Sequence, residues 1–162
     1  MSATIRELME KDIPKVLSLF SKLSEEMAEV SFTEVATHEQ VMEWLSNPNT
    51  FVYVAADDDV ILAVIRARRG SGHQDHAAHI TVAVDYSFRG NNLAQNLTNF
   101  CTQELKRHGI KIVRAEIYSN NLPSINTVLS CGFSLAGTVL MHHYDANQQA
   151  YVDDLMFHKL LL

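Results

Sequence analysis

Hydrophobic positions along the chain recur with two different periods, and the changes between them divide the sequence into expected elements. Alternation with period two is typical of strands, whereas spacings of three and four residues are typical of helices. Strands are expected at residues 4–7, 50–56, 60–68, 76–84, 110–118, 134–144 and 150–161. Helices are expected at residues 13–23, 37–47, 93–108 and 123–132. The segment between the first two helices, residues 24–32, is expected to be a linker or a short helical turn.

Local signals mark where these helices begin and end. Asp12 precedes the first hydrophobic position of its helix and is expected to cap it, while Thr37 and Gln40 have the spacing of a capping box. Gly109 and Gly132 follow the last positions of the third and fourth helices, where glycine commonly ends a helix. The fourth helix is expected to turn three side chains inward, those of Ile125, Val128 and Leu129.

The order of these elements indicates one mixed α/β domain over residues 1–162. Residues 57–59 join two strands as a hairpin, and residues 145–149 join the last two in the same way. The strand at 76–84 leads through a helix to the strand at 110–118, which is the pattern of a parallel crossover. We find no repeat, low-complexity tract or interdomain linker in the sequence.

Composition fits a globular protein of the cytoplasm. With 162 residues, 47% of them hydrophobic and 20% charged, the chain is long enough for one domain with a core. No apolar run approaches the ~20 residues of a membrane-spanning helix. The N-terminus carries charges where a signal peptide is apolar, so we expect a cytoplasmic protein with no membrane partner. Cys101 and Cys131 lie in apolar helical patterns and are expected to be buried, reduced thiols.

Charge is distributed unevenly along the chain. Between Lys22 and Arg66 there is no Lys or Arg. The acids in that segment are Glu25, Glu26, Glu29, Glu34, Glu39, Glu43, Asp57, Asp58 and Asp59. An acidic segment beside a mildly basic remainder suits a protein with two ligands of opposite charge, although two solvated helical faces give the same pattern. A nucleic-acid partner is not expected, because such proteins are more basic than this chain.

The segment "FRGNNLA", residues 88–94, has the make-up of an anion-binding turn. Arg89 and Gly90 lead from a strand into a helix, whose unpaired N–H groups and positive end favour a phosphate. Asn92 stands where such turns usually carry a second glycine. After glycine, Asn most readily accepts a left-handed conformation, so Asn92 is expected to allow the turn and to hold its anion more loosely. An ordinary strand-to-helix connection is the alternative.

A second motif, "NLPSINTVLSCGF", begins 29 residues beyond Asn92. Together with the turn it resembles the GNAT family of acyl-CoA-dependent N-acetyltransferases. The matching order is Val82-Ala83-Val84, the turn from Arg89 to Ala94, a long helix, a strand, Asn121 with Ser124, and Gly132-Phe133. The resemblance covers almost the whole chain. It implies a single α/β (α+β mixed) domain, with a mostly antiparallel seven-stranded sheet that is splayed between strands four and five and flanked by about four helices.

The resemblance also implies acetyl-CoA as co-substrate, with no metal. In the family, pantetheine pairs with strand backbone in the gap between the splayed strands, and Val82, Ala83 and Val84 would supply that backbone here. The N–H groups that would wrap the pyrophosphate are those of Arg89, Gly90, Asn91, Asn92, Leu93, Ala94 and Gln95. Asn121 and Ser124 match the motif beside the pantetheine arm. Val82 and Val84 also read as plain core positions, and both interpretations hold together because the contacts are main-chain.

Catalysis requires a base, because an amine arrives as ammonium and must lose a proton before it attacks. Glu116 stands where several bacterial members similar to this chain carry a base glutamate, while a surface glutamate paired with Arg114 or a neighbouring lysine is the alternative. The family usually places a Tyr acid where this chain has Val128, which donates nothing. Either water assists the leaving thiolate, or turnover is slow, or another hydroxyl replaces the Tyr. The hydroxyls considered are those of Tyr118, Ser124 and Ser130.

Three histidines and an aspartate lie close together in the sequence, namely His73, Asp75, His76 and His79. These are metal-ligand types, but the spacing runs from loop into strand, where His76 and His79 point to opposite faces. We therefore expect no metal. A histidine that relays a proton in the acceptor cleft and a solvated loop are the remaining interpretations.

The sequence as a whole predicts an N-acetyltransferase that transfers acetyl from acetyl-CoA to a primary amine of a small molecule, protein or peptide. The acidic segment lies on helices that line the acceptor side in the family, so a cationic acceptor is expected. A CoA-binding sensor without activity is the main alternative, because Val128 and Asn92 depart from the pattern. An unrelated α/β domain is the third. The last two strands are expected to allow a homodimer by adding to a partner's sheet.

Overall fold

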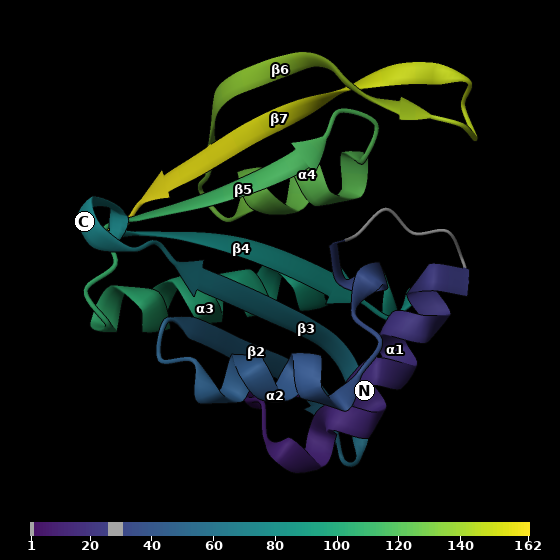
Figure 1. Ribbon diagram of the computed structural model, residues 1–162, viewed down its shortest axis with the longest axis vertical. Coiled ribbons are helices and arrows are strands. Elements are labelled where there is room, and N and C mark those ends of the chain that lie inside the picture. The colour runs from purple at the N-terminus through teal and green to yellow at the C-terminus, as the bar shows by residue number, and fades with distance from the viewer. Residues whose placement is uncertain (1, 26–30) are drawn as a thin grey trace.

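A seven-stranded sheet runs through the molecule, with α-helices packed on both of its faces (Figure 1). The structure is a computed structural model that describes residues 2–25 and 31–162. Among these residues the strands are β1 Thr4–Glu7, β2 Thr50–Asp57, β3 Val60–Arg69, β4 Ala77–Val84, β5 Ile112–Tyr118, β6 Ser134–Asp145 and β7 Ala150–Leu160. The α-helices are α1 Ile13–Glu25, α2 His38–Ser46, α3 Leu93–Arg107 and α4 Leu122–Ser130. Short 3-10 helices lie at η1 Glu10–Asp12, η2 Ser31–Glu34, η3 Gly72–Gln74 and η4 Tyr86–Phe88.

The strands lie in the order β1-β2-β3-β4-β5-β7-β6. β4 and β5 run parallel, and the other neighbouring pairs are antiparallel. The predicted mixed fold, with its mostly antiparallel seven-stranded sheet and its four α-helices, is therefore confirmed within the described part of the chain. The expected strands and helices also form close to the expected bounds, because the hydrophobic period changes where the elements change.

The start of α1 differs from the sequence expectation. Asp12 directly precedes α1, but its carboxylate does not cap that helix. Instead it accepts two hydrogen bonds from the Arg6 guanidinium, at 2.7 and 2.9 Å, and one from the Met9 N–H at 2.9 Å. A bidentate hydrogen bond from a charged guanidinium is stronger than a hydrogen bond from a neutral backbone N–H at a helix cap. This difference explains why the buried Asp12 carboxylate turns back toward β1.

The ends of the other helices largely follow the sequence. The capping box of α2 is confirmed, because Gln40 N–H donates to the Thr37 hydroxyl and the Gln40 side chain accepts from Thr37 N–H. The prediction that Leu129 points inward is wrong, because its side chain is 50% exposed, whereas Val128 is buried. A helix as short as α4 meets the sheet along one narrow stripe, which Val128 occupies. Of the predicted linker, residues 26–30 lie outside the described residues.

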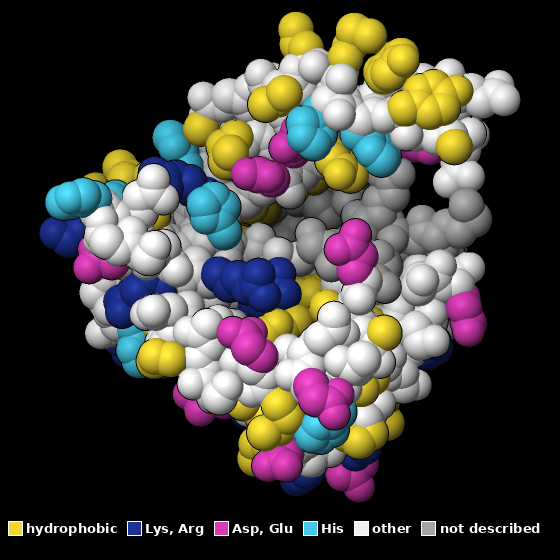
Figure 2. All heavy atoms as spheres, viewed as in Figure 1, with side chains coloured by type: hydrophobic (Ala, Val, Ile, Leu, Met, Phe, Trp, Pro, Cys, Tyr) yellow, Lys and Arg dark blue, Asp and Glu magenta, His cyan; other side chains and the backbone are white. Residues whose placement is uncertain are grey.

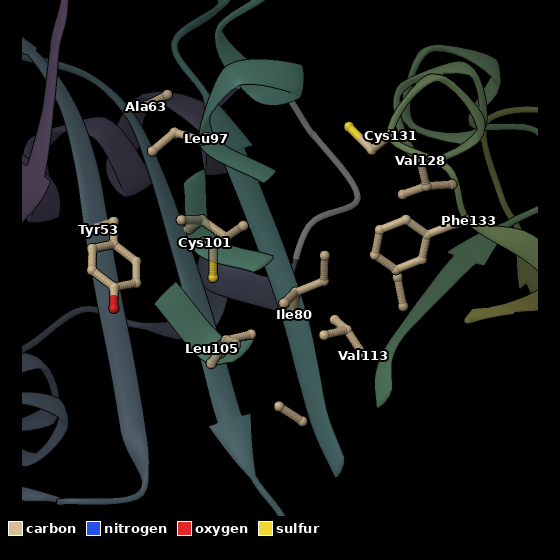
Figure 3. Packing of buried hydrophobic residues seen from close by; sticks show 14 of the residues in the cluster. Tyr53, Ala63, Ile80, Leu97, Cys101, Leu105, Val113, Val128, Cys131 and Phe133 are labelled. Atoms are coloured by element: carbon tan, nitrogen blue, oxygen red, sulfur yellow. The ribbon is translucent and has the colours of Figure 1, made fainter. Parts of the chain in front are cut away.

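The two faces of the sheet carry separate hydrophobic clusters. α1 and α2 pack on one face, called the α1 face here, where the rings of Phe20, Phe32 and Trp44 contact one another. α3 and α4 pack on the opposite α3 face, in the cluster that Figure 3 shows from close by. Cys101 and Cys131 are buried in that cluster as free thiols, as predicted.

β4 and β5 separate soon after they begin side by side. Their pairing covers three positions, Ala77 with Ile112, Ala78 with Val113 and His79 with Arg114. Figure 1 shows the two strands diverging beyond this point. The divergence is consistent with the predicted splay, and it leaves a gap between the last residues of β4, up to Val84, and those of β5, up to Tyr118.

Candidate functional site

The β4 backbone directs hydrogen-bonding groups of Val82 and Val84 toward the gap. Asp85 N–H donates to the Leu62 carbonyl of β3 at 2.9 Å, so Asp85 faces β3. Successive residues of an extended strand present their N–H and C=O groups to opposite edges. Val84 and Val82 therefore face the edge from which β5 has moved away, whereas Ala83 faces β3. The two valines lie where an extended ligand can pair with β4, and the backbone of Ala83 does not.

The turn before α3 has the conformation that the sequence predicts. Gly90 has φ 81°, and Asn92 has φ 58° and ψ 20°, so both lie in the left-handed region. The Asn92 carbonyl accepts the first bond of α3, from Asn96 N–H at 2.9 Å. The N–H groups of Leu93, Ala94 and Gln95 therefore have no partner within the helix. These donors, at the positive end of a 15-residue helix, form a place where an anion can bind.

Two hydrogen bonds of Asp85 and a cation–π contact of Arg89 fix the residues around this turn. The Asp85 carboxylate bonds the Lys22 ammonium of α1 at 2.7 Å and the Ser87 N–H at 3.0 Å. Burial alone would raise the pKa of Asp85, but the Lys22 and Ser87 bonds outweigh it and the pKa lies below its ordinary value. The Arg89 guanidinium lies over the Tyr86 ring, 5.1 Å from its centroid. The end of β4 is thus bonded to α1, and the Arg89 side chain at the start of the turn packs on Tyr86.

α4 borders the same gap from the other side. Asn121 caps α4, and its side-chain oxygen accepts from Ser124 N–H at 3.3 Å. The Cys131 thiol donates to the Gln95 carbonyl at 3.6 Å and so links α4 to the start of α3. Figure 3 shows Val128 beside Cys131 within the α3-face cluster. Val128 is 5% exposed, so the position of the family's Tyr acid is a packed hydrophobic one here.

Glu116 lies on the α1 face of β5, exposed to solvent. The alternative to the base role, an ion pair between Glu116 and Arg114, does not form. No ion pair among the described residues involves Glu116. Asp154 of β7 lies one position along on the same face, because it pairs with Tyr118 while Glu116 pairs with Met156. Burial raises the pKa of Asp154, and the nearby Glu116 charge acts in the same direction.

The sequence did not predict Asp154 or the nearby His142 as site residues. The Tyr118 ring stacks on the His143 ring with centroids 4.9 Å apart, and lies 6.2 Å from that of His142. β6 is irregular between Val139 and His143, which changes where its side chains lie relative to β7. Alternation along β7 predicts that Asp154 shares a face with Met156 and His158. The sequence gives no signal of the irregularity in β6.

The histidine-rich segment does not form a cluster. His76 lies in the turn before β4, where its carbonyl accepts from Lys111 N–H at 2.8 Å, and His79 is exposed on the α1 face. Within residues 2–25 and 31–162, no three His, Cys, Asp or Glu side chains are arranged to hold a metal ion. No helix in this part of the chain has the length and apolar character needed to cross a membrane.

The α1 face is hollowed between the helices α1 and α2 and the strands β5 to β7 (Figure 2). Arg66 of β3 lies on this face between two rings, with its Cζ 4.9 Å from the centroids of both Phe32 and Trp44. Burial lowers the pKa of Arg66 to about 10, with a smaller contribution from Arg68, while Glu43 opposes the shift. Arg66 therefore remains a cation at neutral pH.

Comparison with known proteins matches these features to one family. The model of the acetyltransferase (GNAT) family matches residues 16–133. No curated protein sequence matches significantly. Similar solved structures include a ribosomal-protein-alanine N-acetyltransferase from Brucella melitensis, with 23% identity over 98% of this chain and 99% of that one, and a TM-score of 0.85. An N-acetyltransferase from Staphylococcus aureus Mu50 has 19% identity over 100% of both chains and a TM-score of 0.87. YncA from Salmonella typhimurium, solved with acetyl-CoA, has 17% identity over 100% of this chain and 95% of that one, and a TM-score of 0.88.

Proposed function

Because the chain belongs to the acetyltransferase (GNAT) family, we propose that it transfers an acetyl group from acetyl-CoA to a primary amine of a small molecule or peptide. The gap between β4 and β5 is the observation that carries the proposal. It is bordered by the backbone groups of Val82 and Val84 and by the left-handed turn before α3. An extended polar arm that ends in a pyrophosphate matches these two features together.

Residues of this chain fit acetyl-CoA, which supplies the acetyl group as an activated thioester. Val82 and Val84 would pair with the pantetheine arm as a neighbouring strand does. The turn from Arg89 to Gln95 would bind the pyrophosphate through its N–H groups and the positive end of α3. The Asn121 side-chain oxygen accepts from Ser124 N–H, and the two N–H donors of the same amide would contact the arm.

Glu116 is the residue that we propose as the base. An alkylammonium has a pKa of about 10, so a base must take its proton before the nitrogen attacks, and the Glu116 carboxylate can do so. The new N–C bond then forms, the C–S bond breaks, and the thiolate receives a proton. Val128 cannot supply that proton, and Tyr118, two residues beyond Glu116 on the same face, is the nearest hydroxyl along β5. Water is the other source.

Part of the acidic segment is exposed to solvent on α1, η2 and α2. Glu25, Glu34 and Glu39 are exposed, as is Glu43, while Glu26 and Glu29 lie outside the described residues. We propose that these carboxylates attract the positively charged amine of the acceptor before it binds.

Release of free thiol from acetyl-CoA, measured across a panel of amines, tests the proposed function. Turnover with at least one primary amine, and formation of its N-acetyl product, would support it. A second candidate, a CoA-binding sensor, is favoured by the hydrophobic Val128 at the acid position. Thermal stabilisation by acetyl-CoA with no turnover of any amine would identify the sensor, and absence of stabilisation would reject both.

A further inference from the structure

Four basic side chains lie side by side across four strands of the sheet. Arg68 of β3 pairs with His79 of β4, His79 with Arg114 of β5, and Arg114 with His158 of β7. Residues that pair directly share a face, because side chains alternate along each strand. The neighbours Ala67, Ala78, Val113 and Phe157 belong to the cluster on the α3 face. The basic row therefore lies on the α1 face.

The row is accessible, and none of its members forms an ion pair within the described residues. Arg68 and His79 are exposed, and Arg114 and His158 are half-buried. Ion pairs in the described part of the chain are Arg6–Asp12, Lys15–Asp59, Lys22–Asp85 and Arg107–Glu104, so none uses the row. In Figure 2, Lys and Arg side chains lie in the hollow with His and acidic side chains around them. Such a row, with donors on neighbouring strands, fits a carboxylate or phosphonate group.

The row lies next to the proposed reaction centre. His79 and Arg114 form the last pair before β4 and β5 diverge, so the row borders the closed end of the gap. Glu116 follows Arg114 by two residues on the same face, which places their Cα atoms about 7 Å apart along the strand. A molecule only a few bonds long can therefore contact both the row and Glu116.

We propose that the acceptor is a small amine that also carries an acidic group, a carboxylate or phosphonate a few bonds from its nitrogen. The basic row binds the acid, and this contact places the amine at Glu116. The inference rests on the proposed function and narrows it from primary amines in general to amino-acid-like molecules. The exposed carboxylates of α1, η2 and α2 act on the ammonium end of the same molecule, so both charge patterns serve one zwitterion.

Matched pairs of amines with and without the acidic group test this inference. The pairs are L-lysine with cadaverine, L-phenylalanine with 2-phenylethylamine, and 2-aminoethylphosphonate with ethylamine, and spermidine serves as a polycation. We expect the acid-bearing member of every pair that is acetylated to have the higher kcat/KM, by about tenfold or more, since a charged hydrogen-bonded contact is lost in the other.

Substitutions in the row separate recognition of the acid from general damage. Arg114→Gln and the exposed Arg68→Gln should each lower kcat/KM for the acid-bearing member by a larger factor than for its partner without the acid, through a higher KM. Arg107→Gln is the matched control, because it removes the same charge from α3 on the other face of the sheet. Circular dichroism and thermal unfolding verify that each variant is folded.

The possible failures are distinguishable. Equal or better use of amines without an acid, with spermidine as the preferred substrate, would overturn the inference and leave the proposed function intact. The inference would also be overturned, with the proposed function intact, if Arg114→Gln lowered kcat/KM equally for both members of a pair. If no amine is acetylated, the proposed function fails. Calorimetric titration of N-acetyl-L-phenylalanine into the CoA-bound protein then still tests whether the row binds an acidic group. Binding that weakens in Arg114→Gln supports an acid site, and absence of binding overturns it.

Discussion

The left-handed conformation of Asn92 leads to a prediction in which Ala and Gly have opposite effects at two nearby positions. For an L-residue this region costs roughly 1–2 kcal/mol, which Asn reduces and Gly avoids. The Asn92 side chain makes no cap hydrogen bond, and its carbonyl bond to Asn96 N–H survives any substitution. We expect Asn92→Ala to lower the free energy of unfolding by about 1 kcal/mol and Asn92→Gly to leave it within about 0.5 kcal/mol.

Asn96 provides the control, because it is exposed and lies one turn later in α3. There Ala should exceed Gly in stability by about 1 kcal/mol, the ordinary helical preference. Urea denaturation of the four variants measures both orders. If Ala also exceeded Gly at position 92, the residue would not have the left-handed conformation and the reasoning would fail.

The same variants test the role of the turn in binding. Calorimetric titration with acetyl-CoA should show Asn92→Gly binding about threefold tighter, because removal of the side chain allows a closer backbone approach to the pyrophosphate. Weaker binding by Asn92→Gly would show instead that the amide itself contacts the ligand.

Three further predictions concern catalysis, pH and assembly. Glu116→Gln should lower the acetylation rate at neutral pH by about 100-fold and recover in part as pH rises toward the amine pKa, whereas unaltered rates would exclude Glu116 as the base. Hydrogen bonds from Arg6 lower the pKa of Asp12 although burial opposes them, so this carboxylate stabilises the fold above its unfolded pKa of about 3.9 and loses that effect as pH falls through its lower folded value. Asp12→Asn should therefore cost about 2 kcal/mol at pH 7 in urea denaturation and progressively less below pH ~4, and a pH-independent difference would contradict this. The edge strand β6 exposes Leu140 (73%) and Met141 (64%), so light scattering should detect a homodimer that Leu140→Glu weakens, and a monomer at every concentration would refute it.

Local chemistry made much of the fold and the conformation of the turn before α3 predictable. The period of hydrophobic residues defined the elements, and the tolerance of Asn for positive φ indicated the conformation of Asn92 correctly. These signals depend on a few neighbouring residues. The predicted cap at Asp12 was wrong because Arg6, on a different element, offers that carboxylate a stronger partner.

The features that the sequence did not predict depend on register between distant strands. Arg68, His79, Arg114 and His158 come from four strands, and only the pairing of β3, β4, β5 and β7 aligns them. A shift of one residue in any pair would move a basic side chain to the opposite face. Asp154 could not be predicted for a related reason, because its surroundings depend on the irregular part of β6.

The short parallel contact between β4 and β5 also has a mechanical consequence. Three paired positions and the packing of α4 against α3 join the half of the sheet with β1 to β4 to the half with β5 to β7. This seam carries less hydrogen bonding than the antiparallel pairs on either side of it. A ligand that pairs with Val82 and Val84 would continue the sheet across the seam and couple the two halves. Acyl-CoA would then be a structural strand of the folded protein as well as its co-substrate, and amide exchange should slow in both halves when it binds.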